Sequence, residues 1–237
     1  MANFDLELSI EAMDAIISFA GYGNQSAPVW FIGFEEGLGK MDSEDTAKNL
    51  IARGAFEKTM DLNDAHLRLS EGGKLIEIER QATFNPVWVW MAKIMLARKG
   101  HSGWRNTERA KEYIRSQLGR STGETFLTEL SPIPSPNAKD QAWMRWFRER
   151  DLQLDTKMKQ RQEALRRVLE VKPPPLVICY GSSRADAFAE LLGTEWLPAC
   201  DKVYKSSDSR CLLLPFFGHG RMSHSVIEGL LECGLLC

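Results

Sequence analysis

The sequence predicts an α/β fold, a three-layer α/β/α domain around a mostly parallel central sheet of about four strands. Four short apolar runs, each bounded by breakers or polar residues, are typical of strands that are buried on both faces, as parallel strands are. Segments of ten or more residues with helical spacing lie between these runs, and this alternation is typical of βαβ units. The four runs are residues 28–33, 125–130, 176–181 and 211–217.

Capping residues and glycine stops mark the helices that we expect between these strands. Asn85 followed by Pro86 is a typical helix start, and Gly100 is a typical stop. Thr107 is the expected cap of a later helix that Gly119 ends. The expected helices cover residues 9–20, 87–98, 108–118, 139–171 with a break near 151–156, 184–192 and 224–233, and a weak edge strand is expected at 202–205.

The composition fits a single domain over residues 1–237. The chain is 43% hydrophobic and 26% charged, with a net charge of -2 at pH 7, which is close to the average for globular domains. Its acidic beginning lacks the positive region of a signal peptide, and no apolar run approaches the ~20 residues that span a bilayer. We therefore expect no membrane partner and a cytoplasmic location. The near-neutral charge carries no overall nucleic-acid signature.

The cysteines indicate buried, reduced thiols rather than a disulfide framework or a metal site. There are five of them, all in the last third of the chain, and none forms a C-x-x-C pair. No other histidine or cysteine has a spacing that would make a metal site together with His219. We therefore expect no metal and no cofactor.

The residues that follow each strand are the candidates for function, because open α/β sheets bind ligands beyond the carboxyl ends of their strands. After the first run, three glycines predict a turn that presents Glu35 and Glu36. The spacing differs from that of a phosphate-binding loop, since five residues separate Gly33 from the Gly39-Lys40 pair and Met41 follows. A buried carboxylate here would act as a base or hold a water molecule, and a solvated acidic loop is the alternative.

The later strand ends add two more candidate side chains. Glu129 lies near the end of the second run, before a proline-rich stretch over residues 132–136 that predicts an extended, rigid pocket wall. Either Glu129 points into a pocket or the strand ends before it. His219 stands between two glycines after the fourth run, where a histidine reaches a ligand or is satisfied by the backbone. The chain's other histidines lack such a setting.

In this order the strand ends resemble the uracil-DNA glycosylase superfamily. Residues 29–37 are similar to that family's first motif, and residues 219–223 are similar to its last one. The segments 129–136 and 177–192 are similar to the core between them. The resemblance implies an enzyme that excises a damaged or unusual base from DNA by hydrolysing the N-glycosidic bond, with the base turned out of the duplex into a pocket.

The resemblance also implies a role for individual residues. Glu35 takes the place of the residue that orients the attacking water, and His219 that of the histidine that hydrogen-bonds the base as charge builds on it. Phe84 would stack on the base, Glu129 would read its edge, and Met222 would enter the vacated stack as an apolar wedge. The remaining wall of the binding pocket would be Gly33, Phe34 and Ser131.

Several departures keep other interpretations open. An ionised Glu129 only accepts hydrogen bonds, so it would suit a base edge that presents amino or ring N–H donors rather than uracil. The family branch with an iron–sulfur cluster has cysteines before the first motif, whereas here none precedes Cys179. Basic residues between Arg145 and Arg167 alternate with acids, so a solvated helix face is the first interpretation and DNA contact the second.

Two other functions remain alongside excision. One is a non-catalytic protein of the same fold that binds a nucleobase or nucleic acid. The other is a different α/β hydrolytic or nucleotide enzyme that shares only the doubly wound plan, although a serine hydrolase is disfavoured because the chain has no G-x-S-x-G elbow.

Overall fold

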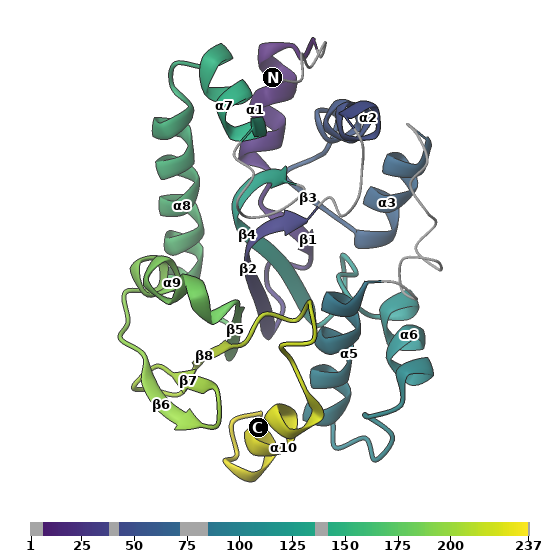
Figure 1. The fold of residues 1–237 in the computed structure, drawn as a ribbon, viewed down its shortest axis with the longest axis vertical. Coiled ribbons are helices and arrows are strands. Elements are labelled where there is room, and N and C mark those ends of the chain that lie inside the picture. Colours follow the sequence, from purple (N-terminus) through teal and green to yellow (C-terminus); the bar gives the residue numbers. More distant parts are fainter. Residues whose placement is uncertain (1–6, 38–42, 72–84, 136–141, 237) are drawn as a thin grey trace.

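A computed structural model shows an eight-stranded sheet with helices packed against both of its faces (Figure 1). The structure describes residues 7–37, 43–71, 85–135 and 142–236. The strands are β1 (Gly21–Gly23), β2 (Val29–Gly37), β3 (Thr59–Met60), β4 (Thr125–Ser135), β5 (Leu176–Tyr180), β6 (Leu197–Cys200), β7 (Val203–Lys205) and β8 (Cys211–Leu214). The helices are α1 (Ile10–Ser18), α2 (Ser43–Arg53), α3 (Leu62–Glu71), α5 (Pro86–Arg98), α6 (Thr107–Ser116), α7 (Ala142–Arg150), α8 (Leu154–Val171), α9 (Ala185–Leu192) and α10 (His224–Glu232), with a 3₁₀ turn at Ser182–Arg184.

The four expected strands form the parallel centre of the sheet. The strand order is β3-β1-β4-β2-β5-β8-β7-β6, and β4, β2, β5 and β8 pair in parallel. The expected number of about four strands was wrong, because short strands extend both edges. In the sheet, β2 lies between β4 and β5. The chain passes from β2 to β4 on one side and then returns from β4 to β5 on the other side, so its direction across the sheet reverses here. This is a topological switch point, the place where open α/β sheets bind ligands.

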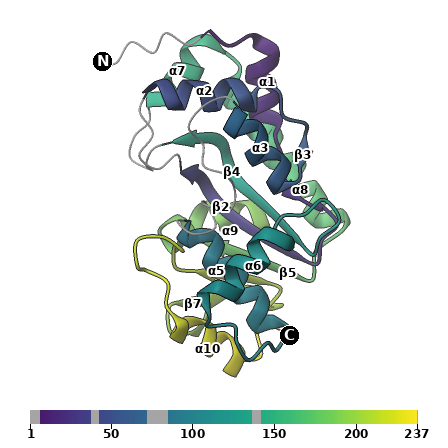
Figure 2. The same cartoon turned by 90° about the vertical axis from the view of Figure 1, so that its right-hand side faces the viewer.

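Alternate residues of β2 point to opposite faces of the sheet, as the period of a strand requires. Phe31 belongs to the core cluster that α5, α6 and α10 cover. Trp30 and Ile32 belong to the cluster under α8 and α9. A third cluster joins α1, α2 and α7 around Ile133 of β4, at the end of the molecule that lies away from α10 (Figure 2). The observed packing is therefore more than a plain sandwich of three layers.

The central strands β2 and β4 are longer than expected, and this corrects the interpretation of two loops. Both strands continue past their apolar runs, so Glu35 and Glu36 lie on a strand rather than in a turn. The proline-rich segment after Glu129 is likewise part of β4. The two extensions pair with each other, Glu35 opposite Ser131, with a register shift before the strands end. Residues 38–40 of the expected glycine loop lie outside the described residues.

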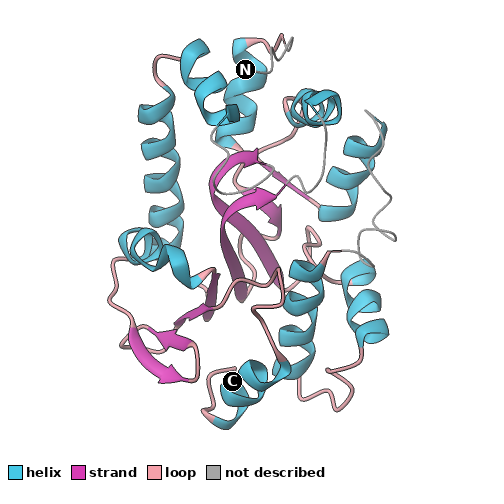
Figure 3. Ribbon diagram, in the orientation of Figure 1, coloured by secondary structure: helices cyan, strands magenta, loops and turns pink. Residues whose placement is uncertain are grey.

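The helices follow the expected pattern with local differences (Figure 3). The Asn85 side chain accepts from the amides of Val87 and Trp88 at the start of α5. Asn106, not Thr107, caps α6, because the amide oxygen of Asn106 accepts two backbone N–H groups. The break between α7 and α8 falls at residues 151–153. Helices α2 and α3 were not expected, and β7 is not an edge strand because β6 covers it.

The structure also bears on the expectations about the cysteines and about membrane-spanning helices. Cys179 and Cys211 are buried free thiols, whereas Cys233 is exposed. Within the described ranges, every helix is too short or too polar to cross a membrane.

Candidate functional site

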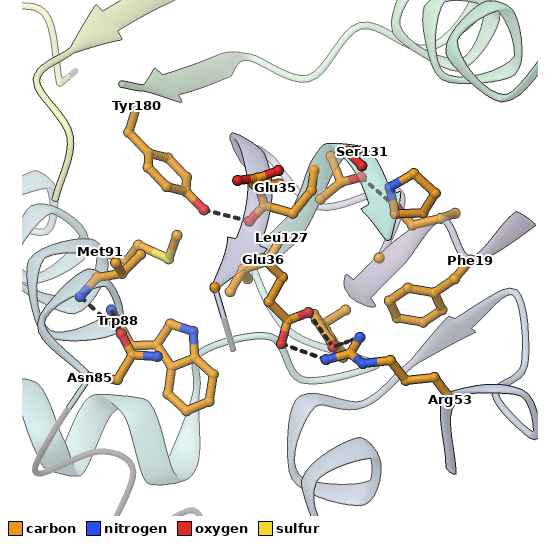
Figure 4. A pocket seen from close by; sticks show the side chains of 18 of the residues that line it. Phe19, Glu35, Glu36, Arg53, Asn85, Trp88, Met91, Leu127, Ser131 and Tyr180 are labelled. Atoms are coloured by element: carbon orange, nitrogen blue, oxygen red, sulfur yellow. Dashed lines mark hydrogen bonds and ion pairs between the residues drawn. The ribbon is translucent and has the colours of Figure 1, made fainter. Parts of the chain in front are cut away.

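A cavity of about 180 Å³ opens beside the switch point at the carboxyl ends of β2 and β4. Figure 4 shows the side chains around it, with Tyr180, Trp88 and Met91 on one side and Phe19 and Arg53 on the other. This volume is below the ~300–1,000 Å³ of pockets for drug-sized ligands. The space therefore suits a single small ring better than a nucleotide. Its charged and ionisable lining residues are Tyr22, Glu35, Glu36, Arg53, His66, Glu129, Arg161 and Tyr180.

Glu129 lines this cavity, and the lack of a side chain at Gly33 makes its position possible. The two residues are register partners on β4 and β2. A Cβ atom on Gly33 would lie 1.9 Å from Glu129 Oε2 and 2.4 Å from the Tyr180 hydroxyl oxygen. The Tyr180 hydroxyl donates to Glu129 Oε1 over 2.7 Å. Oε2 is buried and has no hydrogen-bond partner among the described residues.

The surroundings of Glu129 favour its protonated form. Its pKa is raised to about 8, chiefly by burial; the neighbouring carboxylates Glu36 and Glu35 contribute to this rise, and the Tyr180 hydrogen bond and the charge of Arg161 act against it. The Arg161 guanidinium is itself committed elsewhere, since it donates to the backbone oxygens of Phe19 and Leu130. At neutral pH Glu129 is therefore mostly a neutral carboxylic acid.

Glu36, by contrast, is held in its ionised form. Burial works to raise its pKa, but the Arg53 guanidinium more than offsets this, and the pKa of Glu36 is lowered. Arg53 Nη2 lies 2.7 Å from Glu36 Oε1, and the Tyr22 hydroxyl donates to Oε2 over 2.9 Å. Arg53 also donates to the side chain of Asn49. This network fixes one wall of the cavity, with a buried guanidinium that is 4% exposed.

Glu35 lies at the end of the same strand and is half-buried. The Ser135 hydroxyl donates to Glu35 Oε1 over 3.0 Å. Burial raises the pKa of Glu35, while the Ser135 hydrogen bond and the charge of Arg184 act against that rise. A carboxylate with a raised pKa and one oxygen already fixed is a suitable proton acceptor for a water molecule.

His66 lines the cavity from α3 and was missed by the sequence analysis. It is 4% exposed, and within the described part of the chain neither ring nitrogen has a hydrogen-bond partner. Burial lowers its pKa to about 4, so its imidazole is neutral at pH 7. Its ring packs edge-on against Trp88 at 4.9 Å. The spacing of Leu62, His66 and Leu69 places it on the apolar face of a helix, a signal that was available but was not used.

Some of the predicted pocket residues lie at the cavity and others do not. Ser131 lines the cavity and is buried, and its hydroxyl donates to the Ile133 carbonyl. Gly33 lies against Glu129, as described above. Phe34 instead contacts Arg184, whose guanidinium carbon lies 4.1 Å from the ring centroid. Phe84 lies outside the described residues.

His219 and Met222 do not line the cavity. His219 is exposed, and its backbone has a positive φ of 54°. Its ring lies 5.9 Å from that of Phe216, a lining residue, so it stands behind the cavity wall. Met222 is 4% exposed within the core, so in this conformation it presents no wedge to the surface.

Three residues of the basic run are committed to internal contacts. Arg161 is buried, as described above, which corrects its placement on a solvated face. Lys157 lies 2.6 Å from both Asp14 and Asp151, and Arg166 donates to backbone oxygens at the end of α9. These three side chains hold helices together, whereas Arg145, Lys159 and Arg167 of the same run are exposed.

Comparisons with protein-family models, curated proteins and solved structures find no match for this chain. The site must therefore be judged on its own chemistry. The described residues include no cluster of three or more histidine, cysteine or acidic side chains that would hold a metal ion. What they do form is a small cavity with aromatic walls. Its lining includes a neutral acid (Glu129), an acid paired with Arg53 (Glu36), a half-buried acid (Glu35) and a neutral imidazole (His66).

Proposed function

We propose that this chain binds a nucleobase in the cavity and hydrolyses the N-glycosidic bond that joins the base to DNA, as its resemblance to the uracil-DNA glycosylase superfamily implies. The observation that carries the proposal is the meeting of Glu35 and Glu129 around one ring-sized cavity at the switch point. The two carboxyl groups have different surroundings, and such a difference allows one site to hold both a proton acceptor (Glu35) and a neutral acid (Glu129).

In this proposal Glu35 is the residue that activates water. Its Oε1 is fixed by the Ser135 hydroxyl, which leaves Oε2 to accept a proton from a water molecule. The water oxygen forms a bond to the sugar C1′, the C1′–N bond breaks, and its electron pair leaves with the base. The proton released by the water goes to Glu35, whose raised pKa favours the transfer.

The negative charge on the departing base requires a donor in the cavity. His66 is neutral, and one of its ring nitrogens carries a hydrogen without a partner in the described structure. An imidazole N–H that is fixed against Trp88 stabilises charge without having to reorganise. We therefore assign to His66 the electrostatic role that the resemblance gives to His219.

A second candidate is binding without cleavage, and one observation favours it. Duplex DNA requires a row of cationic side chains that is free to meet phosphates. Lys157, Arg161 and Arg166 are instead committed to internal partners, which leaves fewer residues of the basic run for such a row. A protein that binds a free base or nucleoside would not need such a row.

The test is incubation with oligonucleotides that carry uracil, hypoxanthine, xanthine or an alkylated base, scored for abasic sites under single-turnover conditions. We expect Glu35→Gln to reduce the cleavage rate by about 10²–10⁴-fold, the usual contribution of a positioned base. Glu163→Gln is the matched control, since Glu163 is exposed on α8.

The outcomes separate the candidates. Cleavage that depends on Glu35 and His66 supports excision through these residues. Cleavage that depends on His219 instead would show that the His219 loop supplies the charge stabilisation. Binding of bases with no cleavage of any substrate would favour the second candidate.

A further inference from the structure

We propose that Glu129 selects the bound ring, and that it does so as a neutral carboxylic acid that pairs with an edge bearing one hydrogen-bond donor next to one acceptor. This inference rests on the proposed function, because it names the class of base that the same cavity takes. It reverses the expectation that Glu129 would prefer an edge made only of donors.

The first argument is the position of the carboxyl group. Glu129 lines the cavity, and Tyr180 is the one residue that hydrogen-bonds its carboxyl group in the described structure. The hydroxyl of Tyr180 is itself buried and keeps its proton, because burial raises its pKa well above the ordinary value. Tyr180 therefore donates, and Glu129 Oε1 accepts. The partnerless oxygen, Oε2, is the atom that is left for a proton.

The second argument is the charge that faces Glu129 from each neighbouring element. Strand β2 contributes two acids, Glu35 and Glu36, and both disfavour another negative charge. Helix α8 contributes Arg161, whose N–H groups point to backbone oxygens. The remaining nearby cation, Arg53 of α2, is paired with Glu36, and His66 of α3 is neutral at pH 7. No described cation contacts the Glu129 carboxyl group.

The third argument is the hydrogen-bonding pattern that follows. A protonated carboxyl donates through one oxygen and accepts through the other, which matches the pattern of an asparagine or glutamine amide. Oε1 has two lone pairs, so it accepts from a ring N–H while it still accepts from Tyr180. Oε2–H donates to the adjacent carbonyl. Uracil, hypoxanthine and xanthine each have such an edge, on which a ring N–H lies next to a C=O group.

The same pattern makes recognition depend on pH. When the proton leaves, both oxygens become acceptors, and Oε2 then faces the ligand carbonyl without a hydrogen between them. The affinity falls with the protonated fraction of Glu129. With a pKa of about 8, that fraction drops about tenfold between pH 7 and pH 9.

The test uses 2-pyridone, a single ring with one N–H next to one C=O that does not titrate in this range. Its dissociation constant is measured by ligand-observed NMR between pH 6 and pH 9 for the wild type and for Glu129→Gln. We expect the wild type to lose about tenfold in affinity from pH 7 to pH 9. The variant, whose amide keeps its donor, should change by less than about twofold. The matched ligand is 1-methyl-2-pyridone, which lacks the N–H and should bind weakly to both proteins.

A second measurement does not depend on the variant. Infrared difference spectra of the wild type should show a protonated carboxyl band that shifts when 2-pyridone binds and that disappears above pH 8. Binding of 2-pyridone that is equally strong at pH 7 and pH 9, or that weakens equally in both proteins, would overturn the role of Glu129 and leave base binding intact. If no base or 2-pyridone binds at any pH and no oligonucleotide is cleaved, the proposed function fails, and this inference fails with it.

Discussion

The proton on Glu129 makes the stability of the ligand-free protein depend on pH, and Glu129→Gln should remove that dependence. The folded protein keeps this proton up to about pH 8, whereas an ordinary glutamate releases it near 4.5. Between these values the folded state binds more protons than the unfolded chain. The free energy of unfolding therefore falls as the pH rises, and its contribution from Glu129 is fully present only below about pH 4.5.

The size of the effect follows from the same two values. Each pH unit between them lowers the free energy of unfolding by about 1.4 kcal/mol. The full interval therefore amounts to about 5 kcal/mol, and the part below pH 7 to about 3 kcal/mol. A typical domain has a total stability of about 5–15 kcal/mol, so the change is large enough to measure.

Urea unfolding at intervals between pH 4.5 and pH 9 measures this contribution as a difference between the two proteins. Glutamine has the same shape, still accepts from Tyr180 and never ionises, so groups such as His66 and Glu36 titrate in both proteins and largely cancel. We expect Glu129→Gln to match the wild type near pH 4.5 and to exceed its stability by about 5 kcal/mol above pH 8. Glu163→Gln should follow the wild type throughout. A difference that stays constant across the range would show that Glu129 ionises normally in the fold.

Three further substitutions test the packing around the site. Gly33→Ala places a methyl group 1.9 Å from Glu129 Oε2, so it should cost about 1–3 kcal/mol in urea unfolding at pH 6 and weaken 2-pyridone binding; unchanged binding would show that the carboxyl group has room to move. Arg53→Met leaves Glu36 without its guanidinium and should cost about 3–5 kcal/mol at pH 7, an effect that should shrink at pH 4 if the lost charge pair causes it. Arg161→Met removes the donors to two buried carbonyl oxygens, and we expect a loss of about 1–3 kcal/mol for each, measured by thermal unfolding; a near-neutral effect would mean that other donors replace it.

The centre of the fold was predictable because buried parallel strands have a distinct composition. The segments around Val29, Val177 and Leu212 are apolar runs, and the segment around Phe126 is apolar apart from its threonines and Glu129. All four became central strands. The edges were not predictable in the same way. Strand β1 is a three-residue segment with two glycines, and it forms a strand because Tyr22 pairs with Leu127. Such pairing is a property of the neighbouring strand rather than of the local sequence.

The site was predictable in part, for a related reason. Acidic residues after an apolar run are conspicuous in a sequence, so Glu35 and Glu129 were selected. Their protonation states were not accessible, because these depend on neighbours such as Arg53 and Tyr180 that are distant in the chain. His66 escaped notice because the helix that carries it was not expected. His219 was selected for its glycine neighbours, yet the same glycines accompany a loop that keeps its ring outside the cavity.

The register of β2 and β4 explains why two acids in one sheet behave differently. Opposite Glu129 the neighbouring strand carries Gly33, so the carboxyl group lies over the backbone, away from water, and no described cation is in contact with it. Two residues further along, Glu35 lies opposite Ser131 at the rim, with the hydroxyl of Ser135 bonded to it. A shift of one residue in this register would place Phe34 opposite Glu129 and fill the space that the acid occupies. The pairing of a glycine with an acid on adjacent parallel strands is therefore what produces a neutral carboxyl group beside an ionisable one. Acids that lie opposite a glycine in other parallel sheets should likewise have raised pKa values, and a search for such pairs tests this explanation.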